Sequence, residues 1–489
     1  MPEQSLRKKA YHGFFWSFVE RFLIQFIQFA LQIVLARLLF PSDFGLIGMM
    51  TIFIVISRLF VDSGLGSALI QKQNRTEDDF STVFYFNIVV CAACYVLIFI
   101  SAPYISAFYY APELTHIIRI FFLSVIIDSF TIVQVTKLRI ALDFKKKAIC
   151  NLFAVVISGG VGVWMAYSGY GVWSLVMQTI TNSLVTLIVL SALVRWKPLL
   201  IFSKSSFNQL FGFGSRLLGA ALVDSIIDNL YLFFLGRYFS KKQVGFYTRG
   251  LQVPSVIIVT LTSILENVTY PMMSSIQGEK EYLIAVYKRL IRMVSFLTVP
   301  AMLGLAFISE PFVRYFLTEK WMPAVVLMQW VCFARIFTPI NLLNMSLLNS
   351  IGRSDLFLKN NLIRLPVTIT LLIITIPRGI EAVVISQFCV SIIGFFINSF
   401  MPGKLFGYGA FAQLKDLLPA ILSSLIMLVA MAAATCKLEH DLVKMIVSFA
   451  AGVASYLLVN IVIKTEGIKE IRSLMTTVYK RHENLNKNI

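Results

Sequence analysis

Polar side chains follow one face of the first apolar run of the chain, residues 14–38. They are Ser17, Arg21, Gln25, Gln28 and Gln32. Their helical spacing places them in one stripe along a single helix. Guanidinium and amide groups donate hydrogen bonds to anions and other polar ligands, and a stripe of them is costly in contact with lipid. The pattern therefore predicts a helix that faces a water-filled path or other protein.

More arginines lie within later apolar runs. They are Arg58, Arg119, Arg216, Arg249 and Arg335. An arginine at the centre of a bilayer costs about 2.5–3.5 kcal/mol on an insertion scale, so these side chains must also face protein or water. A planar guanidinium binds two oxygens of an anion at once. We predict a substrate cavity lined by Arg21, Gln25, Gln28, Arg58, Arg216, Arg249 and Arg335.

Each arginine also has a purely structural explanation. Arg58 lies one helical turn before Asp62 and can form an ion pair with it. Arg216 can pair with Asp224 two turns later, or it can extend to the membrane interface. Arg119 lies close to the end of its apolar run and can extend in the same way. The sequence leaves both explanations open.

Two aspartates and an asparagine follow one another closely on the seventh predicted helix. Asp224, Asp228 and Asn229 carry oxygen atoms that can bind sodium or a proton, so they are the predicted ion-coupling residues. Pairing with Arg216 or other polar contacts explains them equally well. The sequence contains no GxxxxGK[ST] motif, which argues against direct coupling to ATP.

The sequence predicts no metal centre and no cofactor. Its 4 histidines and 6 cysteines are scattered, without the spacing of a metal or redox site. The acidic cluster Glu77, Asp78 and Asp79 lies in a short loop between apolar runs, and we expect it to be solvated.

The elements that must position these residues are membrane helices. The 489-residue chain is 58% hydrophobic and only 14% charged, which is typical of an integral membrane protein. Apolar runs long enough to cross the bilayer as helices recur about fourteen times. Alternating ten-residue segments, which a membrane barrel would need, are absent. We predict an all-α integral membrane protein, with a kink at Pro339 after Arg335.

Charge placement predicts the orientation. Most of the 43 Lys and Arg residues lie in segments that would share one side of the membrane with the N-terminus. By the positive-inside rule that side is cytoplasmic, so both termini are predicted to be cytoplasmic. The net charge of +18 is thus explained by membrane topology, and no nucleic-acid partner is predicted.

Two segments indicate an internal duplication. ARLLFPSDFGLI from Ala36 aligns with GRYFSKKQVGFY from Gly236, which matches Arg37 to Arg237 and Gly45 to Gly245. We predict two pseudo-symmetric six-helix lobes around a central cavity, followed by two further helices and a cytoplasmic tail. Their predicted bounds are 1–203, 204–401 and 402–489. Parallel lobes with a substrate path between them are a transporter architecture.

The run LARLLFPSDFGLIGMMTIFIVISRLFVDSGLGSALIQKQNRTEDDFSTVFYFN, which begins at Leu35, resembles the Wzx-type polysaccharide flippases. The resemblance is to the branch that includes the colanic acid exporter, and SLRKKAYHGFFWS and RIALDFKKKA resemble that branch too. It implies membership of the MOP superfamily, which also holds the lipid II flippases and the MATE drug exporters.

The resemblance also implies a function. Undecaprenyl-diphosphate-linked oligosaccharide repeat units would cross the bacterial inner membrane by alternating access, for O-antigen, capsule or exopolysaccharide synthesis. Lipid II flippases carry cavity arginines on their first, second and eighth helices, where Arg21, Arg58 and Arg249 fall. The implied partners are the lipid-linked oligosaccharide, the bilayer, and a polysaccharide polymerase with its chain-length machinery. The chain would be a secondary transporter and not an enzyme.

Other functions remain open at this point. Lipid II translocation is a closely related function, although the sequence resemblance favours polysaccharide repeat units. A MATE-type exporter of organic cations would need an acidic cavity, and the arginines argue against one. A membrane polymerase or glycosyltransferase would need paired catalytic acids or a large outer loop, and the outer linkers are short and lack such pairs.

Overall fold

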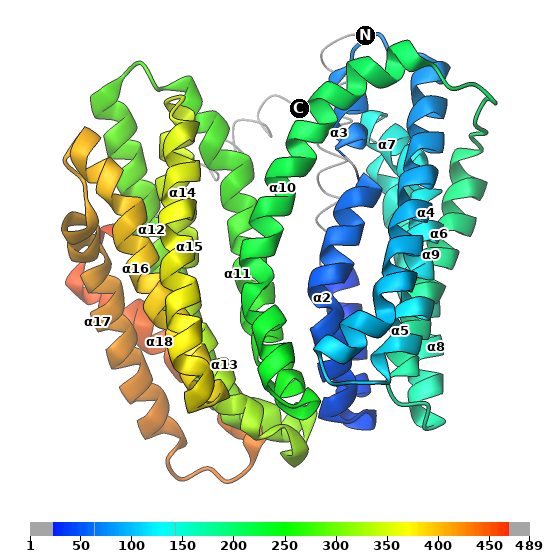
Figure 1. The fold of residues 1–489 in the computed structure, drawn as a ribbon. Helices are drawn as coiled ribbons and strands as arrows, with labels where there is room; N and C mark the ends of the chain where they lie inside the picture. The colour runs from blue at the N-terminus through cyan, green and yellow to red at the C-terminus, as the bar shows by residue number, and fades with distance from the viewer. Residues whose placement is uncertain (1–22, 63, 142, 469–489) are drawn as a thin grey trace, which may run out of the picture. The chain divides into compact units, whose positions relative to one another are not determined.

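The computed structural model describes residues 23–468 except for 63 and 142, and the regular structure in that range is helical (Figure 1). A helix at Leu23–Leu38 precedes the labelled ones. These are α2 (Pro41–Asp62), α3 (Leu65–Gln71), α4 (Glu77–Phe108), α5 (Leu114–Phe121), α6 (Leu123–Ser129), α7 (Ile132–Ile140), α8 (Phe144–Tyr167), α9 (Trp173–Val194), α10 (Lys204–Tyr238), α11 (Lys241–Ser275), α12 (Lys280–Phe312), α13 (Pro323–Arg335), α14 (Thr338–Ser350), α15 (Ser354–Thr375), α16 (Ile380–Phe406), α17 (Ala410–Thr435) and α18 (Asp441–Ile463).

Within the described residues, ten helices are long and apolar enough to cross a membrane, or eleven if one bent pair is a single span. The chain is therefore a multi-pass membrane protein, and the predicted all-helical class is confirmed. The predicted number of about fourteen spans is larger than this and is not confirmed.

The apolar run that begins near Thr115 is not one continuous helix. It is divided among α5, α6 and α7, and the axis bends by 42° between Leu114–Ser129 and Ile132–Ile140. A side-chain hydroxyl group lies at each of the two breaks, between α5 and α6 and between α6 and α7. Ser124 donates to the carbonyl of Phe121 (2.7 Å), and Thr131 donates to the carbonyl of Asp128 (2.8 Å). Such side-chain bonds compete with the helical ladder and bend it, so the helix through this apolar run is broken, and a single span across it stays a prediction.

The acidic cluster at the start of α4 is structural. Asp79 is completely buried and pairs with Lys72 at 2.8 Å. It also forms a capping box with Thr76, in which each residue's side chain binds the other's backbone N–H. Glu77 accepts a hydrogen bond from the indole of Trp196 (2.8 Å). The prediction of a solvated cluster was wrong for Asp79, because the first turn of a helix leaves N–H groups that carboxylates satisfy, whereas Glu77 is exposed.

The linker 195–203, which joins α9 to α10, is tied to α4 by its backbone. The backbone N–H of Leu199 donates to the hydroxyl of Ser81 (2.9 Å). The backbone N–H of Ser203 donates to the hydroxyl of Thr82 (3.0 Å). With the indole bond described above, three contacts fix the linker on the first turns of α4.

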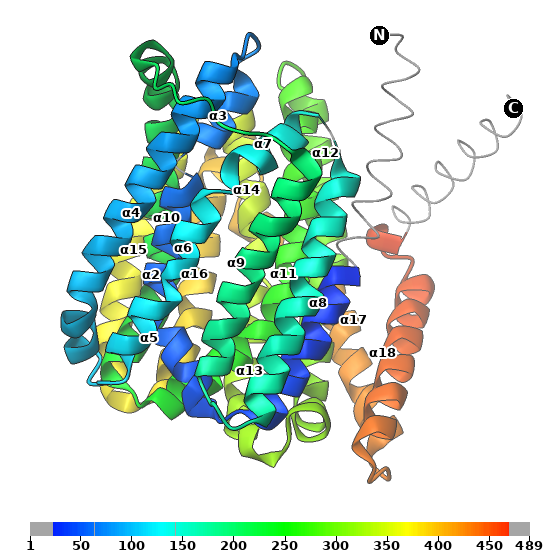
Figure 2. The ribbon, with the colours of Figure 1, turned by 90° about the vertical axis from the view of Figure 1, so that its right-hand side faces the viewer.

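Backbone packing divides the chain into two compact units, the first ending at Gly245 and the second beginning at Phe246. In the first unit α8 and α9 run side by side, and α10 packs on α2 and α3; in the second, α17 and α18 run side by side (Figure 2). The predicted segments 1–203, 204–401 and 402–489 rest on a sequence repeat, and they stay a prediction.

The two aligned sequence segments begin their helices in the same way. Before α2, the backbone N–H of Phe40 donates to the carboxylate of Asp43 (2.9 Å). Before α11, the backbone N–H of Ser240 donates to the side-chain oxygen of Gln243 (3.2 Å). Both bonds cap the unsatisfied N–H groups of a helix start.

These two helix starts also approach each other closely within the first unit. A Cβ atom on Gly45 would lie 1.7 Å from the carbonyl oxygen of Lys241, and one on Gly245 would lie 1.8 Å from that of Pro41. The contact is reciprocal, and only glycine permits it.

The second unit contains a buried polar network inside its apolar core. Tyr287 donates to the side-chain oxygen of Asn344, and Gln413 donates to Asn344 (2.9 Å) and to the hydroxyl of Tyr287 (3.0 Å). All three side chains are fully buried. They join α12, α14 and α17, and their mutual hydrogen bonds offset the cost of burying polar groups.

Candidate functional site

The polar stripe on the first apolar run is described only in part. Arg21 and Ser17 lie outside the described residues. Gln25 and Gln28 lie on the helix Leu23–Leu38, and both are exposed in the structure. Their predicted role in lining a cavity stays a prediction.

Arg58 lies on α2 and is exposed. Its charge acts on Asp128, which lies on α6, and the Asp128 carboxylate accepts a hydrogen bond from Ser183 of α9. Sequence reasoning proposed Asp62 as the partner and did not consider Asp128. The available signal was a lone carboxylate within the apolar run FFLSVIIDSF, since an acid inside a membrane helix needs a partner.

The predicted ion-coupling residues lie along α10. The side chains of Arg216 and Asp224 are outside what the structure describes. Asp228 is exposed, and Asn229 donates to the carbonyl of Ser225 in its own helix (2.8 Å). The proposed binding of sodium or a proton stays a prediction.

Arg249 lies near the start of α11 and is only 5% exposed. Its guanidinium donates a hydrogen bond to the side-chain oxygen of Gln252 and lies 5.7 Å from the ring centroid of Trp321, which is completely buried. The indole face attracts the cation. In this structure Arg249 is therefore packed into the second unit by its protein neighbours.

Arg335 is the last residue of α13 and is partly exposed. α14 begins at Thr338, with Pro339 in its first turn. The helix is interrupted just before the proline at which a kink was predicted, because proline cannot donate the backbone hydrogen bond that would continue α13.

A further arginine, Arg364, lies near the middle of the 22-residue helix α15. Sequence reasoning did not include it among the arginines that lie within apolar runs. Its side chain lies against Gly394 of α16, where a Cβ atom would be 3.5 Å from the arginine Nε. One turn earlier on α15, Asn360 is 5% exposed, and its Nδ2 has no hydrogen-bond partner among the described residues.

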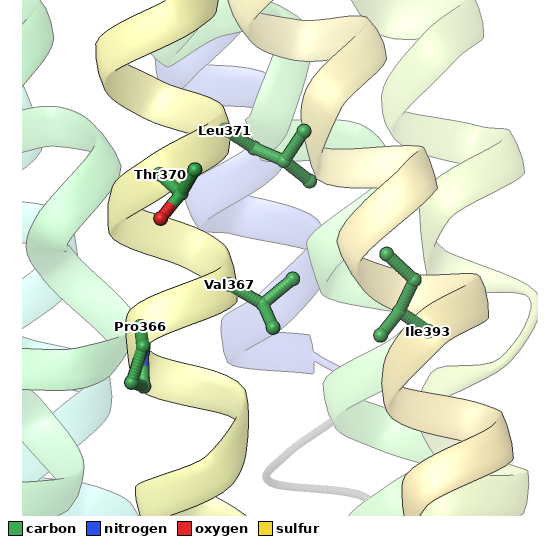
Figure 3. A pocket seen from close by; sticks show the side chains of 5 residues that line it. All are labelled: Pro366, Val367, Thr370, Leu371 and Ile393. Atoms are coloured by element: carbon green, nitrogen blue, oxygen red, sulfur yellow. The ribbon is translucent and has the colours of Figure 1, made fainter.

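An open groove lies next to Arg364, between α15 and α16. Its volume is about 340 Å³, and it is lined by Pro366, Val367, Thr370, Leu371 and Ile393. Figure 3 shows the side chains of Val367 and Leu371 pointing from α15 toward Ile393 on α16. The lining is almost entirely apolar, so the groove suits a hydrocarbon chain.

The chemistry of these side chains is that of anion binding and charge pairing. Among the described residues, no group of three or more His, Cys, Asp or Glu could hold a metal ion. Arg58 belongs to the first unit, whereas Arg249 and Arg335 belong to the second. Their predicted convergence on one cavity stays a prediction.

The model of a family described as polysaccharide biosynthesis protein matches residues 34–326. The lipopolysaccharide biosynthesis protein WzxC of Escherichia coli (strain K12) is 25% identical over 366 residues, which cover 74% of each chain. The succinoglycan biosynthesis transport protein ExoT of Rhizobium meliloti (strain 1021) is 23% identical over 306 residues, covering 63% of this chain and 62% of ExoT.

The fold is similar to that of a solved membrane protein. The lipid II flippase MurJ, in an inward closed conformation, superposes with a TM-score of 0.76 at 15% sequence identity. The superposition covers 91% of this chain and 98% of that one. Nearly the whole chain therefore shares the MurJ fold.

Proposed function

The chain belongs to the polysaccharide biosynthesis protein family, and from that premise we propose that it moves lipid-linked oligosaccharide units across a membrane. The observation that carries the proposal is the combination of this family with the fold of a lipid flippase. The name of the relative ExoT supports transport as the activity. In this proposal no covalent bond is made or broken.

The proposed substrate is an oligosaccharide repeat unit joined through diphosphate to undecaprenol. Its diphosphate carries several charged oxygens, and guanidinium groups bind such oxygens in pairs. Arg21, Arg58, Arg216, Arg249 and Arg335, with Gln25 and Gln28, are the proposed cavity residues. The headgroup crosses by alternating access while the polyprenyl chain stays in lipid, and Asp224, Asp228 and Asn229 couple the cycle to sodium or protons.

The proposed location is the bacterial inner membrane, with both termini in the cytoplasm. The basic residues of the predicted cytoplasmic segments support this orientation. A polysaccharide polymerase and its chain-length machinery are the proposed partners, since they would consume the exported units.

Lipid II is the main alternative substrate. The shared fold alone would permit it, because the MurJ of the comparison is a lipid II flippase. Family membership favours the repeat units of a polysaccharide instead.

The proposal is tested by the pool of polyprenyl-linked glycans in cells that lack the chain. We expect complete repeat units to accumulate on the carrier while surface polysaccharide disappears. Complementation with the unchanged chain, Arg58→Ala or Arg249→Ala at matched protein levels then tests the two arginines. Accumulation of incomplete glycans would point to an enzyme, and an unchanged pool would contradict the proposal.

A further inference from the structure

The linker 195–203 exposes an unbroken run of four apolar side chains. They are Leu199, Leu200, Ile201 and Phe202, and their exposed fractions are 44%, 94%, 47% and 54%. A loop that faces water is instead rich in Gly, Pro, Asn, Asp and Ser. Apolar side chains gathered on a surface mark a place that contacts lipid or another protein. The run therefore needs a partner that removes it from water.

The exposure of this run is fixed by the fold of the first unit. Hydrogen bonds to Ser81 and Thr82 hold the backbone at both ends of the run against α4. The ring of Phe202 lies 5.9 Å from that of Phe207 on α10, and Phe207 stacks on Phe211 at 4.9 Å. These contacts hold the apolar side chains on the outside of the unit and continue their surface onto the first turns of α10.

The ends of two membrane helices give the depth of the linker. α9, which ends at Val194, is one of the helices long and apolar enough to cross a membrane. Its 22 residues make it about 33 Å long, and the hydrocarbon core is roughly 30 Å thick. The linker begins at the next residue, so it lies where the hydrocarbon meets the lipid headgroups. α4, to which the linker is bonded near its start, is also such a helix.

Basic side chains flank the apolar run. Three of them are exposed, namely Arg195, Lys197 and Lys204. The carboxylate of Glu77, which is bonded to this linker, is itself paired with Lys137 at 2.7 Å. Apolar side chains among basic ones are typical of segments that lie on membranes with anionic lipids. A leaflet of such lipids offers acyl chains to the apolar run and phosphates to the basic residues, at the depth where the linker lies.

We infer that the linker 195–203 binds an anionic lipid leaflet. Leu200 and Phe202 insert among the acyl chains, and the three flanking basic residues contact headgroup phosphates. The binding holds the start of α10 at the membrane surface. The inference needs only the membrane helices of the first unit, so it goes beyond the proposed function and does not rest on it.

Photo-crosslinking from the linker tests the inference. The full-length protein carries p-benzoylphenylalanine in place of Leu200 and is placed in nanodiscs of phosphatidylcholine mixed with phosphatidylglycerol. We expect lipid adducts at this position by mass spectrometry, with phosphatidylglycerol enriched over its share of the nanodisc lipid. The control carries the same group in place of Asn74, an exposed residue of the polar turn between α3 and α4, and should give no lipid adduct.

Matched variants separate the charges from the apolar run. Arg195→Gln, Lys197→Gln and Lys204→Gln together should remove the enrichment of phosphatidylglycerol and leave the phosphatidylcholine adducts in place. Each basic residue near an anionic surface contributes about a fivefold preference, so each single replacement should lower the enrichment by about that factor. Lys437→Gln removes an exposed basic residue between α17 and α18 and should leave the enrichment unchanged. Thermal unfolding in the same nanodiscs controls for misfolding.

Two results would overturn the inference. One is labelling of phosphatidylglycerol only in proportion to its share of the lipid, unchanged in the well-folded triple variant. The other comes from irradiation of intact cells. Crosslinks from the position of Leu200 to another protein, without lipid adducts, would show that a protein partner covers the linker. Neither result bears on the proposed function, which the pool of lipid-linked glycans decides separately.

Discussion

The reciprocal glycine contact between the starts of α2 and α11 should make Gly45→Ala destabilising. The new Cβ atom would lie 1.7 Å from the carbonyl oxygen of Lys241, whereas real Cβ atoms essentially never approach another atom within 3.0 Å. The backbone must therefore move apart by about 1.3 Å, and overpacking of this kind costs about 1–3 kcal/mol. The usual gain of about 0.5–1 kcal/mol from replacing a helical glycine offsets part of this cost.

Gly160→Ala is the matched control. It lies inside α8, and its added Cβ atom would have no atom within 4 Å, so we expect it to stabilise the protein by about 0.5–1 kcal/mol. The assay is unfolding of purified protein in mixed micelles titrated with dodecyl sulfate. Equal or greater stability of Gly45→Ala relative to the unchanged protein would refute the steric argument.

The double variant Gly45→Ala with Gly245→Ala tests reciprocity. Once one substitution has separated the two backbones, the second meets less resistance. The combined loss should therefore be smaller than the sum of the single losses, by at least about 0.5 kcal/mol. Additive losses would mean that the two glycines act at independent places.

Three further predictions concern other contacts. Gln413→Ala should lower the free energy of unfolding by about 2–4 kcal/mol, because Tyr287 and Asn344 lose a buried partner; a loss under about 0.5 kcal/mol in micelle unfolding would contradict this. Ser183→Ala should cost about 1 kcal/mol in the same assay, since the Asp128 carboxylate loses a hydrogen bond; no loss would mean that the bond contributes nothing. The hydrogen bond from Lys241 lowers the pKa of Glu113. This pair therefore stabilises the fold fully at a pH above the ordinary glutamate pKa of about 4.3. The stabilisation is lost as the pH falls through the lowered pKa that Glu113 has in the folded protein. Both side chains are partly exposed, so the effect should stay under about 1 kcal/mol, and Glu113→Gln should remove this part of the pH dependence.

Hydrophobic run length predicted the all-helical membrane class of the fold. It could not predict where hydroxyl groups bend a helix, as at Ser124 and Thr131, because these residues are compatible with both straight and bent helices. The interruption at Pro339 was predictable because proline lacks the N–H group that a helix needs.

The candidate site was predictable only in its chemistry. Helical spacing identified arginines that need polar surroundings, but it cannot say which neighbouring charge acts on them, as the electrostatic interaction of Arg58 with Asp128 illustrates. Arg364 was missed because it follows closely on the basic residues of a loop, and composition alone does not distinguish a loop residue from one inside α15. The burial of Asp79 at the start of α4 was missed because burial depends on tertiary packing.

The linker 195–203 also has a consequence for the order in which the chain is made. Its hydrogen-bond partners Glu77, Ser81 and Thr82 all precede it in the sequence. Ribosomes deliver these residues to the membrane first, so the linker can dock on α4 as soon as it emerges. Because domains generally fold in the order of synthesis, the contacts that hold the start of α10 can form while residues after Gly245 are still untranslated. A truncated nascent chain ending after α10 should therefore already protect Trp196 from solvent.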